Sequence, residues 1–131
     1  MKQTIINPAE WQAPKGYSNA ILVEGGSLLF VAGQVGWDRD CRIVSDDFSR
    51  QFGQALENVL TIVESAGGQP ASVTRLLIFV ADKNEYIAKL KEIGAVYRRL
   101  MGRHYPAMTL VEVSALLEDS AKVEIEAIAV I

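Results

Sequence analysis

The stretches PAMTLVEV (residues 106–113) and KVEIEAIAVI (residues 122–131) decide the fold class of this chain. Both are apolar runs of strand length that contain carboxylates, which are costly in a buried strand unless they have a partner or a function. Because side chains alternate along a strand, Glu124 and Glu126 share one face with Ile128. The odd-numbered residues of the second stretch make a uniformly apolar opposite face. We therefore expect the acidic face to form a pocket or a subunit interface.

Two helices and a buried strand are predicted upstream of these stretches. Apolar residues recur at helical spacing from Phe48 to Ala66, and Gly67-Gly68 supplies the helix end. The nearly continuous apolar run Val73–Ala81 predicts a strand that is buried on both faces. A capping-box pattern begins at Asp82, and an apolar stripe continues to Met101, which predicts one further helix.

A hairpin is predicted near the N-terminus. Two apolar runs, Ala20–Val23 and Leu28–Ala32, are joined by Glu24-Gly25-Gly26-Ser27, whose glycines permit a tight turn. The element order is then strand, strand, helix, strand, helix, strand, strand, which predicts a single α+β domain over residues 1–131. Two helices can cover only one face of the sheet. The second apolar face predicts a homo-oligomer.

Composition and charge exclude several classes of protein. The 131 residues have a net charge of −3, which gives no basic face for a nucleic-acid backbone. No run approaches 18 apolar residues, and the first residues lack a hydrophobic signal core, so we expect neither a membrane span nor secretion. Cys41 is the only cysteine, which leaves no disulfide or Cys-x-x-Cys metal pair within the chain. A cytoplasmic location is the default expectation.

Short motifs along residues 16–131 resemble the Rid family, also called the YjgF or reactive-intermediate deaminase family. They are Gly16-Tyr17, Val31-Ala32-Gly33-Gln34-Val35, Ala55-Leu56-Glu57-Asn58-Val59, Glu64-Ser65-Ala66-Gly67, Phe79-Val80-Ala81-Asp82, Pro106-Ala107, Leu110-Val111-Glu112-Val113 and Val123-Glu124-Ile125-Glu126-Ala127-Ile128-Ala129-Val130. Their joint order and spacing carry the resemblance, since no single motif is specific.

The resemblance implies a chorismate-mutase-like α+β fold of the bacillus type and a homotrimer. In such a trimer the helices lie outside, and three clefts between subunits bind small molecules. It also implies hydrolysis of 2-aminoacrylate and related enamines or imines to 2-keto acids and ammonia. It further implies that neither a metal nor an organic cofactor takes part.

The resemblance assigns candidate site residues one by one. Glu124 matches the carboxylate that holds a water near the imine carbon, and is the candidate catalytic residue. The candidate substrate-binding residues are Tyr17, Ala32, Gly33, Gln34, Met108 and Leu110. Ala32 stands where many members have Ser, and Leu110 where many have Cys.

Met108 is the largest departure from the family pattern. The deaminases have at this position an Arg that grips the substrate carboxylate through two parallel hydrogen bonds. Methionine presents a flexible apolar surface instead, and losing the charge-assisted contact removes roughly 1.5–3 kcal/mol of binding. The specificity is therefore expected to differ from that for 2-imino acids.

Structural roles remain open for several of these residues. Glu124 can equally be an interface carboxylate paired with Lys122 or with a neighbouring subunit, and Glu126 fits a structural role better. Tyr17 can be a packing aromatic with a satisfied hydroxyl. His104, the only His, fits a local hydrogen-bonding role. Cations at the end of the second predicted helix interact favourably with the helix dipole. They are Arg98, Arg99 and Arg103. One of them could still reach the cleft and replace the Arg that is missing at position 108.

Two classes of function follow from these residues. The first is an imine or enamine hydrolase with altered specificity, which the retained Glu124 and Tyr17 favour. The alternative is a non-catalytic trimer that binds a small metabolite, which Met108 favours. A ribonuclease activity, attached to some family members, has little support from a chain with negative net charge and one His.

Overall fold

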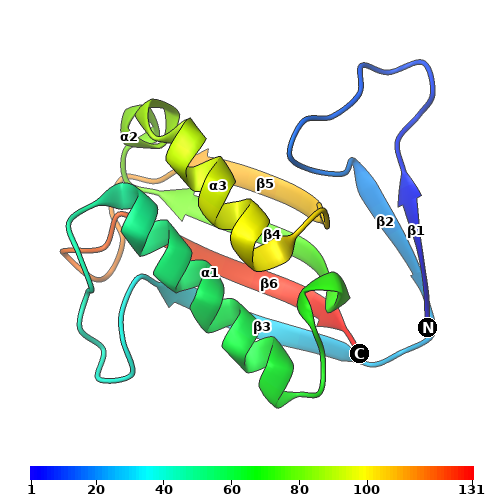
Figure 1. The fold of residues 1–131 in the computed structure, drawn as a ribbon, viewed down its shortest axis with the longest axis horizontal. Coiled ribbons are helices and arrows are strands. Elements are labelled where there is room, and N and C mark those ends of the chain that lie inside the picture. The colour runs from blue at the N-terminus through cyan, green and yellow to red at the C-terminus, as the bar shows by residue number, and fades with distance from the viewer.

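A computed structural model describes all 131 residues as an α+β fold built on one mixed four-stranded sheet (Figure 1). The strand order is β3-β6-β4-β5. The strands are β3 (Leu28–Val35), β4 (Val73–Val80), β5 (Ala107–Glu112) and β6 (Val123–Val130). β6 is antiparallel to both of its neighbours, whereas β4 and β5 are parallel. The two stretches that decided the fold class are thus β5 and β6, with β4 between them.

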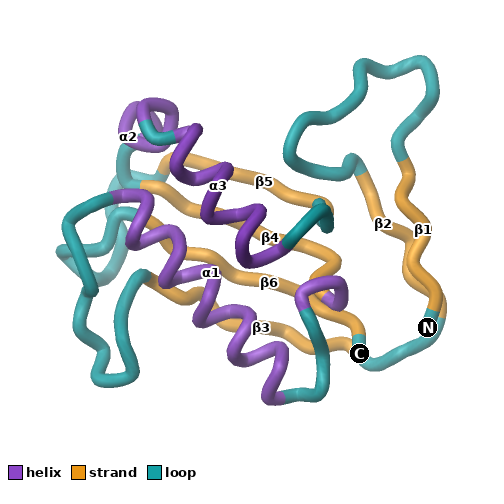
Figure 2. The backbone as a smooth tube through the Cα atoms, viewed as in Figure 1, coloured by secondary structure: helices purple, strands orange, loops and turns teal.

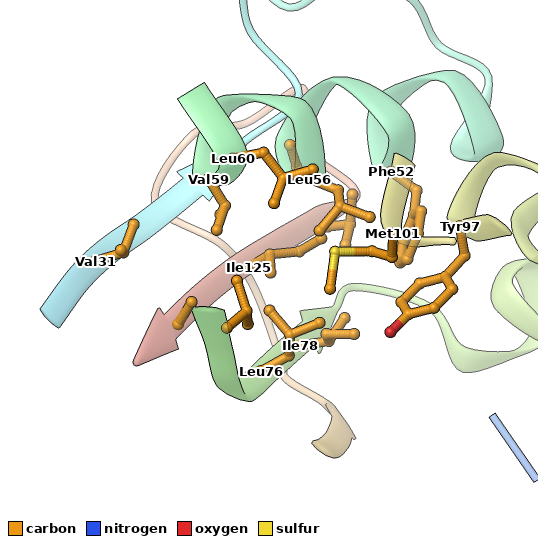
Figure 3. Close-up of a cluster of buried hydrophobic side chains, with 14 of the residues drawn as sticks. Val31, Phe52, Leu56, Val59, Leu60, Leu76, Ile78, Tyr97, Met101 and Ile125 are labelled. Atoms are coloured by element: carbon orange, nitrogen blue, oxygen red, sulfur yellow. The ribbon is translucent and has the colours of Figure 1, made fainter. Parts of the chain in front are cut away.

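Helices α1 (Phe48–Ser65) and α3 (Leu90–Met101) lie across one face of this sheet (Figure 1). A cluster of 19 buried apolar residues fills the space between them and the strands. Figure 3 shows Leu56 and Val59 of α1 gathered with Ile78 and Ile125 of the sheet. The odd-numbered residues of β6 are buried in this cluster, as predicted. They are Val123, Ile125, Ala127 and Ala129.

Local signals at the helix ends explain where α1 begins and ends. The Asp47 carboxylate accepts a hydrogen bond from the Arg50 N–H, which satisfies one of the free donors of the first turn. Ala66 follows the last residue of α1, and Gly67 has a φ of +89°, a left-handed conformation that suits glycine. The predicted boundaries of this helix are confirmed within one residue.

The second predicted helix is divided in the structure. Asp82 begins a short helix α2 (Lys83–Ala88) by accepting from the Asn84 N–H, and α3 starts only after Lys89. Lys89 has φ −111° and ψ 16°, outside the helical region, so one continuous helix was a wrong expectation. α2 buries no residue, whereas α3 buries Ile93, Tyr97 and Met101. The break therefore separates an exposed segment from the one that packs on the sheet.

The predicted N-terminal hairpin is wrong in its pairing. A strand that the sequence pattern did not predict, β1 (Lys2–Ile6), pairs antiparallel with β2 (Ala20–Glu24) and forms a separate two-stranded sheet. Figure 2 shows this pair apart from the four-stranded sheet. β3 pairs only with β6, and Ser27 exchanges two backbone hydrogen bonds with Ile131 of 2.7 and 2.9 Å. The connection through Gly25-Gly26 consequently leads away from the sheet.

The face of the sheet opposite the helices is uncovered. Leu28 and Phe30 of β3 are 65% and 70% exposed there, and Ile128 is half-buried beside them. Glu124 and Glu126 of β6 share this face. The predicted division into one helix-covered face and one open face is thus confirmed. A short 3-10 turn, η1 (Pro70–Ser72), precedes β4. No helix is both long and apolar enough to cross a membrane.

Candidate functional site

The first group of candidate residues lies where β3 meets β6. The register between these strands shifts between Val31 and Gln34, so Ala32 and Gly33 lie in an irregular segment. A β-carbon added to Gly33 would lie 2.8 Å from the carboxyl carbon of Glu124, closer than such atoms approach in proteins. The carboxyl group of Glu124 therefore lies directly against the Gly33 backbone. Only glycine, which has no side chain, leaves room at position 33 for the Glu124 carboxyl group.

Glu124 has no hydrogen-bond or ion-pair partner within the chain. Lys122, a possible partner from the sequence, instead contacts Glu85, with Nζ to carboxylate oxygen distances of 3.2 Å. Phe79 of the neighbouring strand β4 lies directly opposite Glu124. Within one chain, the carboxylate is thus half-buried in part-apolar surroundings and available to a ligand or a water.

The second group lies along β5, at the other edge of the sheet. Tyr17, Met108 and Leu110 line a cavity of about 360 Å³, together with Lys15, Gly16 and Tyr86. Tyr17 is held there by its neighbour, because the Ser18 N–H donates to the Pro106 carbonyl at 3.1 Å and its hydroxyl donates to the Tyr105 carbonyl. These contacts dock the segment before β2 against the beginning of β5.

An adjoining cavity of about 310 Å³ extends this cleft under α3. It shares Lys15, Gly16, Tyr86 and Met108 with the first, and adds Arg98 and aromatic residues. The Tyr97 hydroxyl donates to the His104 carbonyl at 2.7 Å, and the Tyr97 ring stacks on Tyr105 with centroids 5.5 Å apart. Burial, and secondarily the Tyr105 phenol, raises the pKa of Tyr97, which therefore stays protonated.

Lys15, Tyr86, Tyr97 and Tyr105 were not among the sequence candidates for the site. Lys15 directly precedes the Gly16-Tyr17 motif, so its position beside the matched aromatic could have been noticed. Tyr86 of α2 and Tyr97 of α3 reach the cleft through the placement of these helices beside β5, which no local pattern reveals. Burial raises the pKa of Tyr86, which keeps its hydroxyl neutral as well.

The residues left open by the sequence take distinct places. Arg98 lines the cavity next to Met108, whereas Arg99 lines a separate depression beside α1 with Arg50 and Glu57. Arg103 is exposed and lines no cavity. His104 has its Nε2 atom 2.6 Å from the Val73 carbonyl oxygen, which confirms the expected local hydrogen-bonding role.

Gln34 is separated from the other candidates of its motif. It lies opposite Ile125, whose side chain is buried under the helices, and lines a depression with Trp37 and Asn58. It therefore lies on the helix side of the sheet, whereas Glu124 lies on the open face. Within one chain, Gln34 and Glu124 therefore lie on opposite faces of the sheet, and their common role in a cleft between subunits stays a prediction.

The two groups do not meet within one chain. Met108 lies opposite Leu76 and faces the helices, while Glu124 faces away from them at the other side of β4. The expectation that Met108 lies near Glu124 concerns a cleft between subunits and stays a prediction. A site that uses both would need two copies. No group of three or more His, Cys, Asp or Glu side chains is close enough to hold a metal ion.

The family model described as Endoribonuclease L-PSP matches residues 8–131, nearly the whole chain. The chain belongs to this family, known as the Rid or YjgF family. A 2-iminobutanoate/2-iminopropanoate deaminase of Salmonella typhimurium is 38% identical over 82% of this chain and 83% of its own length. A RutC family protein of Pyrococcus horikoshii is 39% identical over 98% of both chains.

Solved structures agree with this assignment. The Rid-family protein YyfB of unknown function from Yersinia pestis covers 100% of both chains, with 32% identity and a TM-score of 0.88. Escherichia coli TdcF, solved with bound serine, covers 99% of both chains, with 31% identity and a TM-score of 0.69. The α+β fold expected from the sequence is thereby confirmed.

Proposed function

We propose that this protein hydrolyses imines or enamines without a cofactor, in clefts formed between copies of the chain. The observation that carries this proposal is the unpartnered carboxylate of Glu124 against the Gly33 backbone. The deaminase name of its Salmonella relative supports the same reaction class. His104, the only histidine, is hydrogen-bonded to the Val73 carbonyl through Nε2, which does not support ribonuclease chemistry.

The reaction needs one group that places water and moves protons. The oxygen of water adds to the C=N carbon while the π pair moves to nitrogen, which takes up a proton. In the resulting carbinolamine the hydroxyl proton moves to nitrogen and the oxygen lone pair forms the C=O bond as the C–N bond breaks, which expels ammonia. Glu124 would accept a proton from the attacking water and return it to nitrogen, a role worth about 10²- to 10⁴-fold in rate.

The substrate class follows from the cleft along β5. Met108 offers no charge there, but Lys15 lines both adjoining cavities and Arg98 lines the one under α3. A guanidinium and an ammonium can hold a carboxylate from positions other than residue 108. The apolar and aromatic lining suits a substrate with a larger side chain than that of 2-aminoacrylate. The proposed substrates are therefore imines with an apolar side chain, with any acid group bound by Lys15 and Arg98.

The decisive assay generates imines enzymatically from a panel of amino acids and amines and follows their decay with and without this protein. Acceleration that Glu124→Gln abolishes supports the proposal. The matched control is Glu126→Gln, two residues along the same face, which should retain activity. If no imine decays faster, or if Glu124→Gln is fully active, the hydrolase proposal fails. A trimer that only binds a metabolite then becomes the better interpretation.

A further inference from the structure

The N-terminal arm, residues 1–24, leaves a strand edge unpaired. The arm comprises β1, β2 and the loop between them, and it is outside the four-stranded sheet (Figures 1 and 2). It exposes Ile5 and Leu22 to solvent, while β3 exposes Leu28 and Phe30 and has no neighbour on its outer side. An unpaired strand edge beside exposed apolar side chains is a template for pairing with another strand.

β2 and β3 are complementary to each other in sequence. A two-residue turn at Gly25-Gly26 defines a register in which Val23 is opposite Leu28 and Ile21 is opposite Phe30. Ile21 and Val23 are then on the open face of the sheet together with Phe30. A slip by one residue would move these side chains to the wrong face, so the apolar pattern favours this register.

The docking of Ser18 prevents β2 from pairing with β3 of its own chain. In the register above, Ser18 is opposite Gly33 at the β3 edge. Yet Ser18 is bonded to Pro106 and Tyr105 at the β5 edge and forms a parallel bridge with Ala107. β3 and β5 are three strand spacings apart, which is about 14 Å at roughly 4.8 Å per spacing. Ser18 cannot reach both edges of one sheet.

We propose that the arm is exchanged, so that β2 of one copy pairs with β3 of a second copy of this chain. Ser18 then keeps its place beside Ala107 of its own chain and lies beside Gly33 of the second copy. The segment before β2 thus joins the β5 edge of one sheet to the β3 edge of the next. Because the two contacting surfaces differ, the contact is head-to-tail, the kind of interface that generates a ring of copies when its rotation closes.

Arm exchange would also unite the two halves of the candidate site. The segment that carries Tyr17, which is docked on the β5 edge of its own chain, then also lies beside the β3 edge of the second chain, one strand from Glu124. The inference deepens the proposed function by stating which chain supplies each half of the cleft. Disulfide crosslinking between chains does not depend on catalytic activity. A failure of arm exchange can therefore be told apart from a failure of the imine-hydrolysis proposal.

Two chains with one added cysteine each provide the test, in a Cys41→Ser background. One carries Val23→Cys and the other Leu28→Cys, with tags of different length. The two residues form a non-hydrogen-bonded antiparallel pair, whose Cα separation of about 4.5–5.5 Å suits a disulfide. After joint unfolding, refolding and mild oxidation, exchange yields a disulfide between the two different chains. A mixture of Val23→Cys with Thr61→Cys, an exposed site on α1, should yield none.

A chain that carries both Val23→Cys and Leu28→Cys distinguishes pairing of β2 with β3 of a second copy from pairing within one chain. Exchange gives covalent oligomers in denaturing, non-reducing electrophoresis. A disulfide within single chains, with no crosslink in the mixture, would show that the arm closes on its own sheet and would overturn the proposal. Absence of any disulfide in folded protein would overturn it as well. The pair Ile21→Cys and Phe30→Cys repeats the test if the first pair impairs folding.

Discussion

The carboxyl group of Glu124 occupies the space that a side chain on Gly33 would need, with 2.8 Å between the carboxyl carbon and an added β-carbon. The contact joins β6 to the irregular segment of β3. It fixes the acid against the backbone without using any hydrogen-bond partner of the chain. The position of the candidate catalytic group therefore depends on the absence of a side chain one strand away.

Gly33→Ala should displace the Glu124 carboxylate while leaving the fold intact, because the obstructing atoms belong to a flexible side chain. A displacement of about 1 Å at a reacting group can cost about 10²-fold in rate, so imine hydrolysis should fall by that order. Steady-state kinetics and circular dichroism are the measurements. Gly67→Ala, which meets no heavy atom within 4 Å but has a φ of +89°, should lower stability without this loss of activity.

Arg98→Gln and Lys15→Gln should each raise KM for imines that carry a carboxylate, by about 10-fold, and leave neutral imines unaffected. The reason is the loss of one charge-assisted contact of about 1.5–3 kcal/mol. Arg99→Gln is the matched control, because Arg99 follows Arg98 on α3 yet lines a different depression. Equal effects of all three variants on charged and neutral imines would refute this assignment.

Met108→Arg should increase kcat/KM for small 2-imino acids by about 10- to 100-fold, because a guanidinium can bind their carboxylate in two places. Met108→Leu, which keeps an apolar group of similar size, should not. Competition between substrates that differ in side-chain length measures the change. No gain from the arginine would mean that the cleft places carboxylates away from residue 108.

Asp47 should make stability depend on pH between about 4 and 2. Hydrogen bonds from the Ser49 hydroxyl and the Arg50 N–H lower the pKa of Asp47 from 3.8 to about 2. Stabilisation by the charged form is therefore complete above pH 4 and is lost as pH falls through 2. Asp47→Asn preserves a capping oxygen, so its stability deficit should shrink over this range, whereas Asp47→Ala should cost about 1 kcal/mol at pH 7.

Chemical unfolding at several pH values measures both differences. A deficit of Asp47→Asn that stays constant from pH 5 to pH 2 would contradict the role given to the charge. The ion pair of Asp47 with Lys89, 3.2 Å between Nζ and Oδ1, is partly exposed and should contribute little.

Gln51→Met should lower the free energy of unfolding by about 3 kcal/mol. The buried amide donates to the carbonyls of Ser45 and Ser120, at 2.8 and 3.0 Å, and accepts from the Lys122 N–H at 2.8 Å. Methionine leaves these three backbone groups without partners, at about 1–3 kcal/mol for each that water cannot reach. Urea unfolding is the measurement. Gln54→Met, which removes one hydrogen bond to Asn58, should cost less than about 1 kcal/mol.

Prediction from the sequence succeeded where local physics decides the structure. The apolar period of α1 and the glycines at its end act within a few residues. The alternation along β6 identified the buried face because side chains on a strand alternate whatever its neighbours are. The break at Lys89 was missed, since the apolar stripe continues across it and only packing of α3 distinguishes the two segments.

The candidate site was predicted as a set of residues rather than as an arrangement. Motifs on different strands could be matched one by one, but the sheet order places β5 and β3 at opposite edges. Whether Met108 and Glu124 act together stays a prediction that depends on a second copy. Lys15 and Arg98 became candidates only through the cavities they share with Met108.

The sequence by itself determined the class of fold, the positions of α1 and the long strands, and the two unlike faces of the sheet, because these follow from periodicity and end signals within short segments. Tertiary structure alone decided which strand pairs with β2. Strands far apart in the chain compete for the same backbone donors and acceptors, and β1 and β6 take the partners that local pattern assigned to a hairpin. That competition leaves the β3 edge open and divides the candidate site between two edges of the sheet.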